Sequence, residues 1–199
     1  WDNIDSKYNY RVNVKKEGNS WKTYKDISGN VGDEITMLWA NMNNTAYIWA
    51  GSKEKDNEYI STTEDQSTED KLKGADLLGM PTTTVIPSTD GISVNFKHAM
   101  SKINLTIELG SEYEFSKEDV DLKITDVKID GSMVKAGYAL NSSTDNPQFY
   151  FDDHYGDPTP ISPYRTGTTP YSKTTGTITK ASATYEAILI PQTIASGNF

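Results

Sequence analysis

Apolar side chains take every second position in several short stretches, and this two-residue period constrains the fold more than any other feature of the sequence. Ile103, Leu105 and Ile107 alternate with polar residues, and similar alternation runs through residues 8–14 and 92–96. Successive side chains of a β-strand point to opposite faces, so each stretch predicts a strand with one buried and one wet face.

Turn residues separate these stretches as a sandwich of sheets requires. S-G-N at 28–30 and D-G at 90–91 and 130–131 favour hairpin turns. Val120, Leu122 and Ile124 alternate, and the apolar positions then change phase, which indicates a β-bulge or a break near 125–126. The more uniformly apolar residues 35–40 and 46–50 are typical of strands packed on both faces. We therefore expect an all-β, mostly antiparallel fold of the sandwich type with little helix.

Helical signals are confined to two places, and two long segments read as loops. S-T-E-D at 67–70 resembles a capping box and predicts one short helix, and S-K-E-D at 116–119 can open a single turn. Residues 51–69 and 141–180 are polar, and five prolines interrupt the second of them. Such loops serve as variable surface insertions or as ligand-contact segments.

The composition argues against several classes of function. The chain has no cysteine, so disulfides, thiolate metal sites and cysteine catalysis are excluded. A net charge of -9 is unfavourable for binding nucleic acid or an anionic membrane. The two histidines, His98 and His154, suffice for neither a histidine-based metal site nor a Ser-His-Asp triad. No phosphate-binding glycine loop or nucleophile elbow is present, so we expect no enzyme, and His98 reads as a hydrogen-bonded structural residue.

Aromatic side chains are the first candidates for ligand contact, because tyrosine and tryptophan rings can stack on sugars. Trp39 and Trp49 lie in apolar stretches and are predicted in the core, whereas Trp1 and Trp21 lie elsewhere. The better candidates are the tyrosines of the second polar segment, which either meet a ligand or pin that segment to the sandwich: Tyr150, Tyr155, Tyr164 and Tyr171.

An acidic cluster in the same segment is the one metal candidate. Asp152, Asp153 and Asp157 surround His154, and clustered carboxylates on a loop can hold calcium. The cluster lacks the alternating aspartates and the distal glutamate of an EF-hand loop. A solvated acidic turn is the alternative interpretation.

An ordered set of short motifs goes beyond this general class. D-Q-S-T at 65–68 and A-D-L-L at 75–78 precede V-N-F-K-H-A-M-S-K-I at 94–103, and A-I-L-I-P-Q-T follows at 187–193. Together these segments resemble the fimbrillin family, the lipoprotein-derived pilins and tip adhesins of Bacteroides-type bacteria. The resemblance covers about two thirds of the chain.

The resemblance implies a fold, a location and a role. It implies two tandem transthyretin-like β-sandwich domains, which we place at residues 1–85, lacking its first strands, and 86–199, truncated at its end. It implies export as a lipoprotein to the outer membrane and the extracellular fimbrium. The expected partners are other fimbrial subunits, bound by β-strand exchange, and a host or bacterial surface protein or glycan; nucleic acid is not expected.

We therefore expect a structural or adhesive subunit of a bacterial surface fibre that is a fragment or a processed form. The alternative from a different class is a secreted carbohydrate-binding module that uses the aromatic residues of 141–180.

Overall fold

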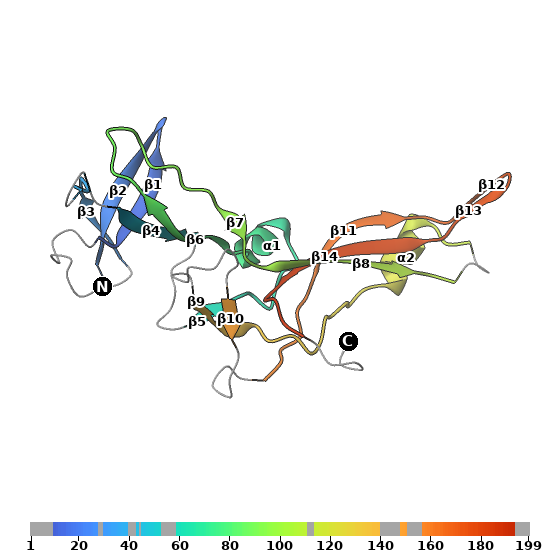
Figure 1. Ribbon diagram of the computed structural model, residues 1–199. Coiled ribbons are helices and arrows are strands. Elements are labelled where there is room, and N and C mark those ends of the chain that lie inside the picture. Colours follow the sequence, from blue (N-terminus) through green and yellow to red (C-terminus); the bar gives the residue numbers. More distant parts are fainter. Residues whose placement is uncertain are drawn as a thin grey trace. The chain divides into compact units, whose positions relative to one another are not determined.

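The computed structural model describes residues 10–27, 30–39, 43, 45–52, 59–110, 114–139, 148–150 and 157–193. Antiparallel sheets dominate this part of the chain, and two short helices accompany them (Figure 1). The predicted all-β class is therefore confirmed at this level. Neither of the two helices described is long and apolar enough to cross a membrane.

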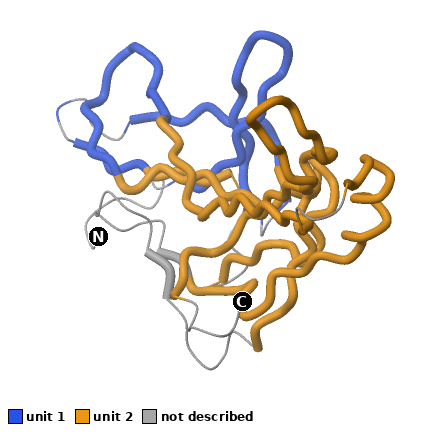
Figure 2. The backbone as a smooth tube through the Cα atoms, turned by 90° about the vertical axis from the view of Figure 1, so that its right-hand side faces the viewer, with its two compact units in different colours: residues 1–48, 83–94 blue, residues 49–82, 95–199 orange. Residues whose placement is uncertain are grey.

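The chain divides into two compact units (Figure 2). Unit 1 comprises residues 1–48 and 83–94, and unit 2 comprises residues 49–82 and 95–199. The chain therefore passes between the units more than once. The single boundary between residues 85 and 86 that the sequence suggests stays a prediction.

Unit 1 contains an antiparallel meander of three strands, β1 (Val12–Glu17), β2 (Ser20–Ile27) and β3 (Asn30–Glu34). The first two strands pair from Val12 opposite Lys25 to Glu17 opposite Ser20. Gly18 makes the turn between them with a φ of 59°, a left-handed conformation that glycine adopts without steric cost. The alternating residues around 8–14 thus lie partly in β1, while residues 1–9 are outside the described residues.

Three predictions for the apolar segments need correction or refinement. Residues 46–50 do lie in a strand, β4 (Ala46–Gly51), but every second side chain is exposed, so it is not packed on both faces. Residues 35–39 form no strand, and neither do residues 92–96. Strand β4 forms a separate sheet with β6 (Leu78–Val85) and β7 (Lys97–His98), in the order β4-β6-β7.

The main sheet of unit 2 has the strand order β11-β14-β8, with β8 (Ser101–Glu108), β11 (Tyr164–Thr169) and β14 (Ser182–Leu189). The predicted strand around Ile103 and Ile107 is β8, and it pairs along the full length of β14. Two further strands, β9 (Lys135–Ala139) and β10 (Gln148–Tyr150), join β5 (Tyr59–Ser61) in a separate antiparallel sheet.

Helix α1 (Glu69–Ala75) confirms the first helical prediction, with Thr68 as its N-cap. Helix α2 (Lys117–Lys123) extends the single turn predicted at 116–119 and shows that the strand predicted from Val120 to Ile124 was wrong. Val120 and Ile124 are buried, whereas Leu122 is 76% exposed. Val120 and Ile124 are four residues apart, a spacing that places them on one face of a helix. The two buried positions therefore follow the helical period and not the alternation of a strand.

The loop predicted at 141–180 contains strands. Besides β11, it forms a hairpin of β12 (Ser172–Thr174) and β13 (Thr177–Thr179), which continues outward from β11 and β14 (Figure 1). Threonine has a high strand propensity, and Pro170 lies between β11 and β12, where it interrupts no ladder. In the same way, part of the loop predicted at 51–69 is strand β5.

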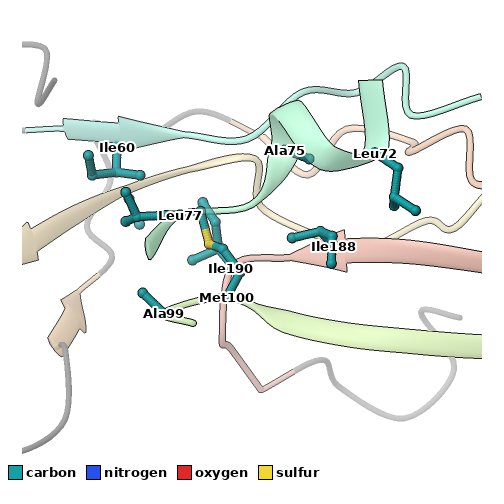
Figure 3. Packing of buried hydrophobic residues seen from close by; sticks show 9 residues of the cluster. Ile60, Leu72, Ala75, Leu77, Ala99, Met100, Ile188 and Ile190 are labelled. Atoms are coloured by element: carbon teal, nitrogen blue, oxygen red, sulfur yellow. The ribbon is translucent and has the colours of Figure 1, made fainter. Parts of the chain in front are cut away.

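Three clusters of buried side chains hold unit 2 together. One, shown in Figure 3, gathers residues from α1, β5, β9 and the end of β14: Ile60, Leu72, Ala75, Leu77, Ala99, Met100, Ala136, Ile188 and Ile190. A second packs Val120 and Ile124 of the α2 region on Ala183 and Tyr185 of β14. The third joins Ile129 and Ile161 to other residues of β14.

Candidate functional site

The motif segments that are far apart in the sequence meet in one core cluster. Leu72 and Ala75 lie on α1, Leu77 follows it, and Ala99 and Met100 precede β8. In Figure 3 these side chains surround Ile188 and Ile190. The backbone N–H of Ala99 also donates to the carbonyl of Leu77 at 2.8 Å. The ordered motifs therefore specify the packing of unit 2 around the end of β14.

Gln66 of the D-Q-S-T motif is fully buried and binds the backbone of β14. Its Nε2 donates to the carbonyls of Ile188 and Thr63 at 2.8 and 3.0 Å, and its Oε1 accepts from the Ile188 N–H at 2.8 Å. Strand β11 stops pairing with β14 at Tyr164 opposite Glu186. The amide of Gln66 thus takes the place of the next residue of a neighbouring strand and satisfies both polar groups of Ile188.

Gln192 of the P-Q-T motif makes a similar pair of bonds with Met133. Its Oε1 accepts from the Met133 N–H at 2.8 Å, and its Nε2 donates to the Met133 carbonyl at 3.0 Å. The same Nε2 lies 3.0 Å from the hydroxyl of the fully buried Ser132. The sequence carried no signal for these two roles, because glutamine in a motif gives no indication of which backbone it binds.

Charged residues of the motifs form local, exposed pairs. Asp65 is bound by Lys71 and by the hydroxyl and N–H of Ser67, and these hydrogen bonds, with that of Lys71 the strongest, lower the pKa of its carboxyl well below the usual range. Nδ1 of His98 lies 2.6 Å from the Asp76 carboxylate at the end of α1. His98 is therefore a hydrogen-bonded residue, as the sequence predicts, and its ring joins β7 to the helix end.

The predicted ligand residues are not brought together by the described part of the chain. Tyr164 is partly buried against the cluster of Figure 3, and Tyr171 packs on the cluster around Val120. Only the backbone of Tyr150 is described, in β10, and Tyr155 lies outside the described residues. Ligand contact by these tyrosines stays a prediction, but the two that are placed have their rings packed on the core.

Of the residues in the calcium candidate, only Asp157 lies in the described part of the chain. Asp157 is exposed, and Asp152, Asp153 and His154 lie outside the described residues. No group of three His, Asp or Glu side chains within the described ranges could hold a metal ion. Calcium binding therefore stays a prediction.

The tryptophans differ from their expected places. Trp49 is 40% exposed, so its prediction as a core residue was wrong, and Trp39 is partly buried, its Nε1 3.3 Å from the Ser88 carbonyl. Trp21 is the most exposed tryptophan of those described, at 70%.

Unit 1 differs from unit 2 in that its described residues include almost no buried apolar side chains. Among its described residues only Pro87 is buried. Most of the large apolar side chains that the described chain exposes belong to unit 1: Val14, Trp21, Ile27, Val31, Met37, Leu38, Tyr47, Ile86, Ile92 and Val94. Leu38 and Ile86 are 62% and 79% exposed, so this unit presents apolar surface that its own described residues do not cover.

Comparison with known proteins now gives the family. The profile of the fimbrillin-like family matches residues 5–199. The chain belongs to the fimbrillin-like family. This family is structural and non-enzymatic, and membership implies a subunit of a cell-surface fimbria. No curated protein and no solved structure shows significant similarity to this fimbrillin-like chain.

Proposed function

We propose that this fimbrillin-like chain is a fibre subunit that assembles by accepting a β-strand from a neighbouring subunit. The observation that carries the proposal is the contrast between the units. Unit 2 buries three apolar clusters, whereas the described residues of unit 1 expose their apolar side chains. An incoming strand would cover such side chains and pair with free backbone groups at a sheet edge in one step.

A part of this surface with few charges is the best place for such a strand, because residues 35–39 have none and residues 86–94 have only Asp90. Met37 and Leu38 lie on one segment, and Ile86, Ile92 and Val94 on another. The bond from Trp39 Nε1 to the Ser88 carbonyl, at 3.3 Å, ties the two segments together. We call these five residues the assembly surface. Covering them removes apolar area from water, and that gain is the main driving force of association.

The family supports the finer parts of the proposal. We propose two tandem transthyretin-like sandwich domains with a boundary near residue 85, export as a lipoprotein to the outer membrane of a Bacteroides-type bacterium, and a structural or adhesive role with other fimbrial subunits as partners. The packing of Tyr164 and Tyr171 on buried clusters favours this reading over a carbohydrate-binding module built on residues 141–180.

Assembly of purified subunits tests the proposal. Ile86→Asp places a charge on the assembly surface, and we expect it to block polymer formation measured by sedimentation and electron microscopy. Leu122→Asp is the matched control, because Leu122 is an equally exposed aliphatic residue on α2 of unit 2, at 76% against 79%. Equal assembly of the two variants would contradict the proposal.

A further inference from the structure

The register of the β1–β2 hairpin sorts its side chains onto two faces of different chemistry. Directly opposed residues of an antiparallel pair share a face. Lys16 is opposite Trp21, and Lys25 is opposite Val12. Val14 and Thr23 form the pair between these two and point to the same side. We call this side of the hairpin the lysine–tryptophan face: Val12, Val14, Lys16, Trp21, Thr23 and Lys25.

The other face of the hairpin carries the acids, and its charges neutralise one another. Glu17 and Glu34 both contact the ammonium group of Lys22, at 3.4 and 2.9 Å. Arg11 pairs with Asp26, and the hydroxyl of Tyr24 donates to Glu17. The Tyr24 hydrogen bond, followed by Lys22, lowers the pKa of the Glu17 carboxyl.

None of the six residues of the lysine–tryptophan face is acidic. The register of β2 with β3 places Asp33 opposite Lys25, but no ion pair joins these two residues in the described part of the chain. Lys16 and Lys25 are exposed, and neither forms an ion pair with any other residue that the structure describes. Trp21 is 70% exposed beside Lys16. In a chain of net charge -9, this face is a local cationic surface with an open aromatic ring.

The two lysines argue against an apolar strand as the occupant of this face. A strand laid over the hairpin would take the ammonium groups of Lys16 and Lys25 out of water, and neither lysine has an ion-pair partner among the described residues, so this burial is costly. The assembly surface, defined above by Met37, Leu38, Ile86, Ile92 and Val94, carries no such charge. The two surfaces therefore suit different partners.

We propose that the lysine–tryptophan face binds an acidic polysaccharide of the uronic-acid type. Carboxylates of the polymer pair with Lys16 and Lys25, while the apolar side of a sugar ring packs on Trp21. Trp21 and Lys25 lie four residues apart on β2, which corresponds to about 13 Å along a strand. This spacing requires an oligomer rather than a single sugar.

Charge density favours a uronic-acid polymer over a nucleic acid. Duplex DNA carries about one charge per 1.7 Å, and its attraction needs many clustered cations. Two lysines on a strongly acidic chain do not offer that, whereas a uronic-acid chain presents one carboxylate per sugar and a ring for Trp21. Such a polymer would be the ligand of an adhesive subunit. Its binding does not depend on strand exchange, because it uses a different surface.

Binding of oligogalacturonate to the purified chain, measured by calorimetry or by ligand-detected NMR, tests the inference. We expect binding that weakens as salt is added, because exposed ion pairs are screened. Trp21→Ala and Lys16→Glu should each reduce the affinity by about fivefold or more. Lys15→Glu is the matched control, because it makes the same charge change on the opposite face of the same strand.

Three results would overturn the inference. One is the absence of oligogalacturonate binding at low salt, and another is equal loss of affinity in Lys15→Glu and Lys16→Glu. The third is equal binding of a neutral oligogalactan or of single-stranded DNA. Monomeric protein suffices for all these measurements, and Ile86→Asp should retain full binding, so failure here and failure of strand exchange are distinguishable.

Discussion

At the scale of single residues, two glutamine amides bind backbone groups, one at Ile188 within β14 and the other at Met133, which lies outside the strands. The amides of Gln66 and Gln192 each bind both the N–H and the carbonyl of one residue, Ile188 and Met133 respectively. A primary amide presents a donor and an acceptor with the spacing of a peptide group, so it can close a ladder where the neighbouring strand ends. The motif letters identified both glutamines as family features, but only the folded chain shows which backbone groups they satisfy.

Removal of the Gln66 amide should destabilise unit 2. Gln66→Ala leaves the Ile188 N–H and carbonyl buried without partners, and we expect the free energy of unfolding to fall by about 3 kcal/mol or more. Gln66→Glu should be at least as harmful, because a carboxylate cannot donate to the two carbonyls. Denaturant titration measures both effects.

Thr63→Ala serves as the control for that measurement. Gln66 binds the backbone carbonyl of Thr63, which the substitution retains. Thr63 is half-buried and its hydroxyl donates to the Asp65 carbonyl at 3.2 Å, so we expect a loss of about 1 kcal/mol, the contribution of one hydrogen bond. A Gln66→Ala variant as stable as Thr63→Ala would show that the buried amide contributes no more than that single hydrogen bond.

At the scale of elements, the sequence predicted those whose pattern was long or carried a cap. Strand β8 has a full alternation, and α1 has its N-cap threonine. The assignment of residues 120–124 failed because residues four apart share a face in a helix as well as in a strand. Val120 of α2 and its C-cap Ile124 are buried, whereas Leu122 between them is exposed. Strands β11, β12 and β13 within 141–180 were missed because threonines rather than alternating apolar residues predominate in them.

Helix α2 depends on a capping box whose strength varies with pH. The N–H of Asp119 donates to the Ser116 hydroxyl at 3.2 Å, and the Ser116 N–H donates to the Asp119 carboxylate at 2.8 Å. The backbone hydrogen bond from Ser116, followed by that of its side chain, lowers the pKa of Asp119 below its ordinary value of 3.8. The ionised carboxylate therefore stabilises the folded state fully above that value, and its contribution is lost as the pH falls through the lowered pKa.

Asp119→Asn should accordingly lower the melting temperature at neutral pH and lose that effect in acid. The amide keeps the shape of the side chain but removes the negative charge from the first turn of the helix. Thermal unfolding followed by circular dichroism from neutral pH to about pH 2 measures the difference between the two proteins. Curves that stay equally far apart in acid would show that the charge of Asp119 is not the cause.

At the scale of the whole molecule, local patterns in the sequence predicted the β class, and the short motifs indicated the family. Neither predicted the division into units. Unit 1 and unit 2 each take two separate parts of the chain. The cluster of proline, threonine and glycine at residues 81–91 suggests a single boundary there and gives no sign of the crossings near residues 48 and 94. The candidate binding surface was missed for a similar reason. The sequence contains Trp21 and Lys16 but does not show that they lie side by side. Their common face depends on the strand register, which pairs residue 21 with residue 16.

The contrast between the units predicts different local stabilities in the unassembled subunit. Strand β14 lies between β8 and β11 and contributes to every buried cluster of unit 2, whereas β2 packs on no buried core in the described part of unit 1. Amides in regions with few buried apolar contacts exchange through openings of low free energy. Hydrogen exchange followed by mass spectrometry should therefore show residues 20–27 exchanging at least about tenfold faster than residues 182–189. Assembly into a polymer should slow exchange in unit 1 and leave β14 unchanged, and equal protection of β2 and β14 in the free subunit would contradict the idea that unit 1 needs a partner to complete its core.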